Sequence, residues 1–358
     1  MNVFVSEYLC SGALSATELP ESLNREGAAM LWAVVDDLRR LPGCRVAITL
    51  DSRLFDSTLA RGFDTCLVEP ISSAHEERSA FDRLVNTCDA TLVIAPETDG
   101  VLARRVRRVL DLGGGSLNCS PAAIELCGDK LRLAQHLTAH NIPTIPTRLF
   151  DFGRDEIPRE HGPSWVLKPR DGAGSWLTFF IPQADRDAWD RARCEFVAAR
   201  AADRVLLQPF IRGQPLSVGC VCHSEGLIEV LPVGLQHISI GRFEYQGGTI
   251  PAHLSDKTRS ACVNLVQRAC ATIPGLSGYI GLDLLVPDAD PSAPIIVEIN
   301  PRLTTSYVGY RRLCRENLAK RLLHLNRKEH HLNEPSPPLN WKTGTVRFDS
   351  GGSCVSAT

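Results

Sequence analysis

Apolar and polar positions follow a repeating strand and helix pattern in the first third of the chain. Short apolar runs occur at 2–5, 44–50, 66–68 and 90–95. Between and after them, apolar residues recur at helical spacing over 27–41, 76–86 and 102–112. This βαβα alternation predicts a parallel sheet with helices on its faces, and ligands in such sheets bind at the loops after the strand ends.

The pattern changes after the glycines at 113–115. A helix is predicted at 121–139, followed by a Pro-broken extended link at 141–146. Strands joined by short glycine loops are predicted at 165–168, 177–181, 205–208 and 216–222. A third section holds predicted strands at 227–233, 282–286 and 295–299 with a helix at 257–273. The fold class is therefore α/β and α+β, with units at 1–120, 121–215 and 216–330. The tail, 331–358, is rich in Pro, Ser and Gly and is predicted to be poorly ordered or to wrap the surface.

Composition narrows the classes of function. The 358 residues carry 39 Lys and Arg against 41 Asp and Glu, so no overall basic field for nucleic acid exists. No apolar run approaches the roughly 18 residues of a membrane helix. The first residues contain no basic stretch and reach an acid at Glu7, which argues against a signal peptide. We therefore expect a cytoplasmic protein with no nucleic-acid or membrane partner.

Cysteine usage supports the same location. The 13 cysteines are scattered without any C-x-x-C motif, which indicates buried reduced thiols rather than disulfides or a zinc knuckle. Cys220 and Cys222 are the closest pair and would share one face of a strand.

The segment 166–175 places a lysine, Lys168, at a strand end before a loop of small residues. Gly172 and Gly174 allow backbone N–H groups to turn toward an anion, and Ser175 follows them. A lysine there would add a charge for phosphate. A tight hairpin turn with a surface lysine would give the same pattern.

Asp283 lies in an apolar run, and Glu298 and Asn300 lie in another. Residues two apart on a strand project to one face, so pairing of the two strands would bring three oxygen-bearing side chains together. Such a set suits Mg²⁺ or Mn²⁺, and Arg302 would reach the same region. A buried Glu–Arg pair with an Asn at a turn is the alternative.

The run 205–213 ends in Gln208, Phe210, Ile211 and a glycine. It fits a plain strand end. It also fits a linker whose backbone groups contact an adenine edge while Phe210 or Ile211 packs near the ring.

These signals in this order, with Asp129 and Lys130 ahead of them, resemble the ATP-grasp superfamily over roughly residues 1–325. The resemblance implies an N-terminal pre-ATP-grasp domain with a parallel sheet and two subdomains that clasp ATP. It implies that Lys130, Lys168 and the 170–175 loop hold the phosphates and that Gln208 to Ile211 hold the adenine. It further implies that Asp283, Glu298 and Asn300 hold Mg²⁺ and that Arg302 is catalytic. Gln214 stands where many members have a ribose-binding Glu.

Several segments resemble the tyramine–glutamate ligase family of methanofuran biosynthesis, whose bacterial relatives would serve a methylofuran-type cofactor. They are 4–8, 26–30, 94–97, 245–248 and 301–309. The resemblance implies ADP-forming ligation of the glutamate side chain to tyramine or a similar amine through an acyl phosphate. Another ATP-grasp peptide or amino-acid ligase and a catalytically silent nucleotide-binding module are the alternatives.

Small-molecule carboxylate and amine substrates need both signs of charge. Glu7 and Glu97, at predicted strand ends, are candidates to pair an ammonium, and Arg302 and Arg242 to pair a carboxylate. Helix capping or solvent exposure is the other reading of the two glutamates. Tyr8, Tyr245 and Tyr307 are candidate walls for a phenol ring, and 242–248 is a candidate mobile loop. Whether the chain forms a homo-oligomer is left open.

Overall fold

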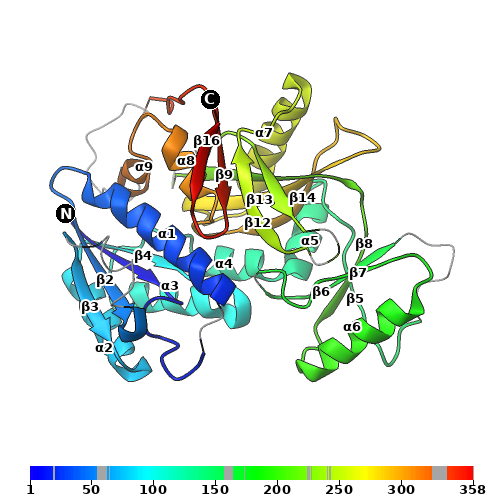
Figure 1. Ribbon diagram of the computed structural model, residues 1–358, viewed down its shortest axis with the longest axis horizontal. Coiled ribbons are helices and arrows are strands. Elements are labelled where there is room, and N and C mark those ends of the chain that lie inside the picture. The colour runs from blue at the N-terminus through cyan, green and yellow to red at the C-terminus, as the bar shows by residue number, and fades with distance from the viewer. Residues whose placement is uncertain are drawn as a thin grey trace.

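The computed structural model describes residues 1–18, 21–54, 63, 65–156, 164–172, 174–223, 226, 228–239, 241, 243–324 and 337–357. Its strands form three sheets, and two large apolar clusters join the first of these sheets to the largest one (Figure 1). No described helix is long and apolar enough to cross a membrane.

The first sheet is parallel, with the order β3-β2-β1-β4. Its strands are β1 (Asn2–Glu7), β2 (Arg45–Asp51), β3 (Leu67–Ile71) and β4 (Ala90–Ile94). Val3 and Val5 pack with α1 (Glu21–Arg39), whereas Phe4 packs with α2 (Ala74–Thr87) and α3 (Val101–Asp111) on the other face. Successive strand residues point to opposite faces, so this run serves both layers. The predicted parallel sheet is confirmed.

A small antiparallel sheet forms a separate lobe with one helix, at the lower right of Figure 1. Its order is β5-β8-β6-β7, and its elements are β5 (Arg148–Leu149), β6 (Trp165–Pro169), β7 (Phe179–Ile181), β8 (Val205–Pro209) and α6 (Arg186–Ala198). Phe196 and Trp189 of the helix pack on this sheet in a cluster of their own. The lobe therefore has its own core, distinct from those of the rest of the molecule.

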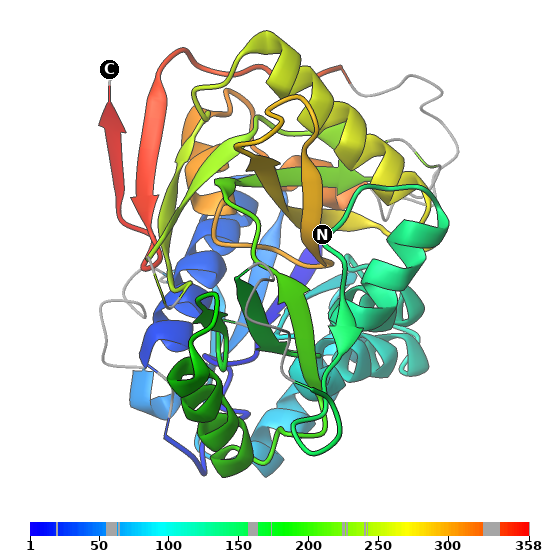
Figure 2. The same cartoon turned by 90° about the vertical axis from the view of Figure 1, so that its right-hand side faces the viewer.

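The largest sheet has the order β14-β13-β9-β11-β12-β15-β16, with β10 paired to β9. Its strands are β9 (Gly213–Cys222), β10 (Ile228–Val230), β11 (Gly234–Ile238), β12 (Tyr245–Ile250), β13 (Gly278–Pro287), β14 (Ile295–Asn300), β15 (Thr345–Asp349) and β16 (Cys354–Ala357). Its central strands, β9 and β13, pair along their full length. Helix α7 (Asp256–Ala271) lies along the outside of the sheet (Figure 2) and buries Val266 and Ala269 against it.

The structure differs from the predictions at one helix and adds detail in the tail. The helix expected at 121–139 is two helices, α4 (Pro121–Gly128) and α5 (Lys130–Ala139). Asp129 between them is extended, and its carboxylate caps α5 by accepting from the amides of Leu131 and Arg132. Helices α8 (Tyr307–Leu313) and α9 (Ala319–His324) were not predicted. The tail supplies β15, which pairs with β12 and buries Val346 and Phe348, and β16, which forms the edge of the sheet. Residues 325–336 and 358 lie outside the described residues.

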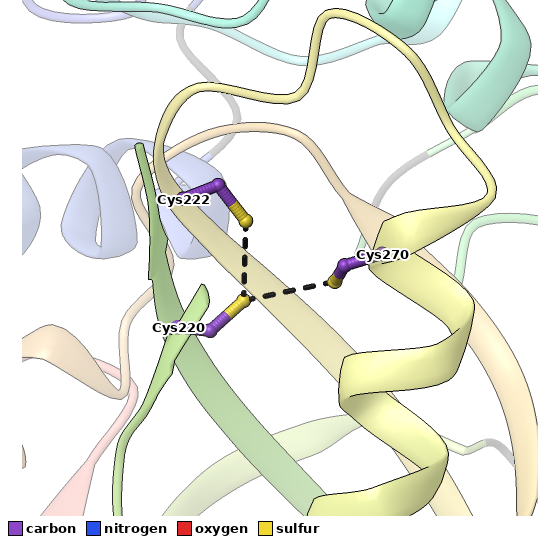
Figure 3. Close-up of side chains that lie close together, drawn as sticks. All are labelled: Cys220, Cys222 and Cys270. Carbon is purple, nitrogen blue, oxygen red and sulfur yellow. Dashed lines mark hydrogen bonds between the residues drawn. The ribbon is translucent and has the colours of Figure 1, made fainter. Parts of the chain in front are cut away.

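The thiols of Cys220 and Cys222 point to the same side of β9, as predicted, and Cys270 of α7 meets them there (Figure 3). Cys220 Sγ lies 4.0 Å from Cys222 Sγ and 3.9 Å from Cys270 Sγ. Hydrogen bonding to these neighbouring thiols, together with burial, raises the pKa of Cys220. The cysteines of the described residues are free, so the expected absence of a disulfide framework holds there.

Candidate functional site

A cavity of about 880 Å³ lies between the small sheet and the largest sheet. Val166 of β6 and Phe180 of β7 line one side, and Leu282 of β13 and Val297 of β14 line the other. This volume lies in the upper part of the range of small-molecule sites, which run to about 1,000 Å³. The cavity can therefore hold more than one small molecule.

The three predicted metal ligands meet on this cavity. β13 and β14 pair antiparallel, with Asp283 directly opposite Glu298 and Gly281 opposite Asn300, so the predicted strand pairing is confirmed. Asn300 Nδ2 donates to Asp283 Oδ2 at 3.3 Å, and Gln236 Nε2 donates to Asp283 Oδ1 at 2.7 Å. A side chain at Gly281 would collide with Thr304, because an added Cβ would lie 2.3 Å from Thr304 Cγ2. This glycine lets the segment after β14 approach the acidic pair.

Two lysines flank the pair. Lys130 Nζ lies 3.3 Å from Glu298 Oε2 and donates to the Gly172 carbonyl at 3.0 Å. Burial, with the charge of Lys130, lowers the pKa of Lys168 to about 8. Although burial opposes it, the charges of Lys130 and Lys168 lower the pKa of Glu298 to about 2. Burial and the Glu298 carboxylate raise the pKa of Asp283. The two lysines therefore favour the ionised form of Glu298, whereas burial and the Glu298 charge disfavour that of Asp283.

These side chains fit a hard divalent cation. Two carboxylates placed opposite each other and an amide form an oxygen-rich donor set, which Mg²⁺ and Mn²⁺ prefer. Burial and the facing Glu298 carboxylate raise the pKa of Asp283, and the charge of a bound cation would offset both effects. The lysines beside it supply charge for phosphate oxygens.

The glycine loop is tethered at both ends. Arg170 forms a bidentate ion pair with Asp129 at 2.8 and 2.6 Å, and its carbonyl accepts from the Lys130 amide at 3.0 Å. Gly174 has φ +67°, a left-handed conformation that favours glycine. The Ser175 hydroxyl donates to the Phe243 carbonyl across the cavity. Gly172, Gly174 and Ser175 line the cavity, whereas Ala173 lies outside the described residues.

The predicted adenine segment also lines the cavity. Gln208 is buried, and its Nε2 donates to Thr147 Oγ1 at 2.7 Å, so its amide group is engaged within the protein. The Phe210 ring lies 4.7 Å from that of Phe180 and 6.4 Å from that of Phe243, measured between centroids. Ile211 lines the same region. Phe180 and Phe243 had no sequence signal beyond being aromatic, and they complete an apolar slot for a planar ring.

Some of the predicted substrate residues line the cavity and others do not. Arg302 and Tyr245 line the cavity, while Glu7, Tyr8 and Glu97 do not. Arg302 Nε donates to Glu97 Oε1 at 2.9 Å, so the two form an ion pair with each other. Arg242 lies outside the described residues.

Glu7 and Tyr8 are held by their own surroundings. Glu7 is only 2% exposed, and its carboxylate accepts from the Cys10 amide at 2.7 Å and lies against Gly27. The Tyr8 ring lies 5.3 Å from the Arg105 guanidinium. Glu7 and Tyr8 thus contact other residues of the first domain and do not line the cavity. The structure gives no support for the direct substrate contacts expected of them.

The structure also differs from the predictions for Tyr307 and for the stretch 242–248. Tyr307 is not a cavity wall, because it is fully buried and donates to Asp37 Oδ2 at 2.8 Å. The stretch expected to be a mobile loop at 242–248 is strand β12 from Tyr245 onward. Tyr245 thus reaches the cavity from a fixed strand.

Sequence reasoning missed two polar residues of the cavity. Gln236 of β11 contacts Asp283, and Glu26 of α1 lines the cavity from the first domain. Both lie far along the chain from the acidic trio. Gln236 stands in no local pattern that indicates chemistry, and Glu26 opens the 26–30 segment that carries the family resemblance but was given no role of its own.

Comparison with known proteins places these features in a family. The ATP-grasp domain family matches residues 127–306, and a pre-ATP-grasp domain family matches residues 44–124. Tyramine--L-glutamate ligase of Methanocaldococcus fervens is 26% identical over 221 residues, which are 62% of this chain and 61% of that protein. The match therefore spans about three fifths of that relative's length.

Solved structures share the fold over nearly the whole chain. An ATP-grasp superfamily protein of Archaeoglobus fulgidus has a TM-score of 0.69 and 22% identity, and the likeness covers 97% of this chain and 92% of that one. A biotin carboxylase of Campylobacter jejuni, solved as a β,γ-ATP complex, has a TM-score of 0.73 and 16% identity, covering 97% and 74%. The acidic pair with its lysines and glycine loop lies inside the matched ATP-grasp domain, which takes up half of the chain, and the chain belongs to the ATP-grasp family.

Proposed function

We propose that this protein is an ATP-dependent ligase that joins a carboxylate to an amine through an acyl phosphate and releases ADP and phosphate. One observation carries the proposal. The opposed carboxylates of Asp283 and Glu298 face a cavity in which Lys130 stands 3.3 Å from Glu298. A carboxylate pair beside lysines, in a cavity large enough for ATP and two small substrates, suits phosphoryl transfer.

The nucleotide would lie along the wall from the aromatic slot to the lysines. Phe180, Phe210 and Ile211 would enclose the adenine, and Lys130, Lys168 and the loop with Gly172, Gly174 and Ser175 would hold the phosphates. Asp283, Glu298 and Asn300 would hold Mg²⁺, or Mn²⁺ in its place. When bound, such a cation supplies charge that offsets the phosphate oxygens. Gln208 would contribute through its backbone, since its side chain bonds to Thr147.

The reaction would have two steps. An oxygen of the substrate carboxylate attacks the γ-phosphorus, the bond to ADP breaks, and an acyl phosphate forms. The amine, after its ammonium form has released a proton to solvent, then attacks the acyl carbon through nitrogen. The bond to phosphate breaks, the phosphate leaves with a proton from that nitrogen, and the amide forms. Lys168 and Arg302 would balance the charge that develops on phosphate oxygens, and the glycine loop would exclude water. The thiol groups of the chain have no part in either step.

The substrates we propose are glutamate, activated at its side chain, and tyramine or a similar aryl-ethylamine, serving a methylofuran-type cofactor in the cytoplasm. Support comes from the name of the relative at 26% identity and from the sequence segments that resemble its family. Tyr245 would be one wall for the phenol ring.

The test is a screen for ADP release by the whole protein with ATP and Mg²⁺. Glutamate is offered alone, with tyramine, and with other amines and amino acids, and the amide product is identified by mass. The Glu298→Gln variant is the background control. Stimulation by tyramine supports the specific proposal. Stimulation only by an amino acid supports a different ATP-grasp amino-acid or peptide ligase, and ATP binding without any ADP release supports a silent nucleotide-binding module.

A further inference from the structure

The first domain contributes one carboxylate to the cavity. Among the described residues up to 120, only Glu26 lines it, from the early part of α1. Tyr245 and Arg302 line the same cavity, and both lie close enough to Glu26 for its charge to influence their titration. Glu26 therefore belongs with the proposed substrate residues rather than with the aromatic slot.

Glu26 has no fixed partner among the described residues. Neither a hydrogen bond nor an ion pair holds its carboxylate there, although Arg25 and Arg302 act on it at longer range. Arg302, the cavity-lining cation whose charge acts on Glu26, forms an ion pair with Glu97 at 2.9 Å. Burial, only partly opposed by Arg302 and Arg25, raises the pKa of Glu26 to about 7. A carboxylate turned to a cavity without a counter-ion is costly unless a ligand supplies the charge.

The chemistry of that ligand follows from its surroundings. The Glu26 carboxylate would repel a phosphate or a second carboxylate, whereas it would form an ion pair with an ammonium. The ring and hydroxyl of Tyr245 could also contact that ammonium. The two glutamates that the sequence offered for this role are engaged elsewhere, Glu97 with Arg302 and Glu7 with the Cys10 amide.

We propose that the Glu26 carboxylate is the docking point for the ammonium group of a substrate. This inference rests on the proposed ligase function, which requires an amine. The ammonium has two sources: the amine that is joined, or the α-ammonium of an amino acid that supplies the carboxylate.

The experiment compares the whole wild-type protein with Glu26→Gln, which keeps the volume and removes the charge. Glu125→Gln is the matched control, because Glu125 is an exposed helical glutamate that pairs with Arg107 at 2.6 Å on the surface. KM values are measured for ATP, glutamate, glutarate and tyramine by ADP release. We expect a roughly 10- to 100-fold rise in KM for one ammonium-bearing substrate, with the KM for ATP unchanged.

The KM measurements distinguish the two possible ammonium groups. If Glu26 holds the joined amine, the KM for tyramine rises. If it holds the α-ammonium, the KM for glutamate rises to that of glutarate, which lacks this group, and tyramine is unaffected. Unchanged KM values for both, in a folded Glu26→Gln protein, overturn the inference while the ligase function stands.

A second readout keeps the inference testable if ADP release fails. Calorimetry measures the binding of tyramine and of glutamate to the wild type and to Glu26→Gln, each with ADP present. Binding that is tighter in the wild type supports the docking site even if the proposed ligase function is wrong. Equal binding, or none in either protein, overturns it. Should Glu26→Gln not fold, Glu26→Asp replaces it, and a shorter reach should still weaken binding about tenfold.

Discussion

Two pairs of carboxylates in this molecule have opposite surroundings. Asp36 and Asp37 on α1 are buried and surrounded by cations, whereas Asp283 and Glu298 face the cavity. Arg311 of α8 pairs with both members of the first pair, at 2.6 Å from Asp37 Oδ1, and Arg39 and Arg40 also contact Asp36. Among the described residues, the second pair has one ion-pair partner, Lys130, whose Nζ lies 3.3 Å from Glu298 Oε2.

The difference distinguishes a structural network from a binding site. Although burial opposes it, Arg39 and Arg311 hold the pKa of Asp36 below its usual value. Asp37 accepts hydrogen bonds from Arg311 and from the Tyr307 hydroxyl, so both carboxylates have partners within the fold. Asp283 instead has a raised pKa because of burial and the nearby Glu298. The ion pairs of Asp36 and Asp37 with Arg311 join α1 to α8. In the proposed site, the charge of a bound cation would complete the pairing of Asp283 and Glu298.

The largest effect is expected at the incompletely paired site. Glu298→Gln removes the carboxylate that faces Asp283 and Lys130, and turnover should fall by about 1,000-fold or more. The melting temperature should change little, because the same change also relieves repulsion with Asp283. ADP release and thermal unfolding measure the two effects. Normal ADP release from a folded Glu298→Gln protein would rule out the assigned role.

The fully paired network should respond in the opposite way. Arg311→Met leaves Asp37 buried without its cation and should lower the free energy of unfolding by about 3–5 kcal/mol. Urea unfolding measures this, with the neighbouring exposed Arg312→Met as control. ADP release by the protein that remains folded should persist. A loss below about 1 kcal/mol would show that the ion pairs do not connect α1 to α8 energetically.

Lys168 tests the phosphate side of the cavity. Lys168→Met keeps most of the volume but removes one cation, which should weaken ATP binding by about 1.5–3 kcal/mol, or roughly 10- to 100-fold. Titration calorimetry with ATP and Mg²⁺ measures it, and Lys257→Met, an exposed lysine on α7, is the control. Equal affinity in the two variants would contradict the placement of the phosphates.

The smallest effect concerns Glu26 and pH. Its pKa is raised from 4.5 to about 7, so the folded state keeps a proton that the unfolded state has lost. This contribution to stability is complete below about pH 4.5 and is lost as pH rises to about 7. Glu26→Gln should lack this loss, so its stability relative to the wild type should rise by about 2–3 kcal/mol between these values. Urea unfolding across this range measures it, and parallel curves would refute the raised pKa.

Much of the fold and part of the site followed from local patterns. The parallel sheet, the glycine loop after Lys168 and the convergence of Asp283 with Glu298 and Asn300 were all predicted, because strand periodicity determines which side chains share a face. The break at Asp129 was missed because an aspartate inside an apolar helical pattern gives a weak signal, although it caps α5.

The amino-acid sequence by itself determined the family resemblance, the order of the motifs and the chemistry that each motif carries. Only the tertiary structure decided which charges are already paired. Glu97 and Arg302 are 205 positions apart and form an ion pair. Glu26 reaches the cavity from the first domain and forms no ion pair with the part of the chain that the structure describes. Local periodicity sets the direction of a side chain on its own strand or helix, but the packing of distant elements sets its partner, so the partner cannot be deduced from spacing.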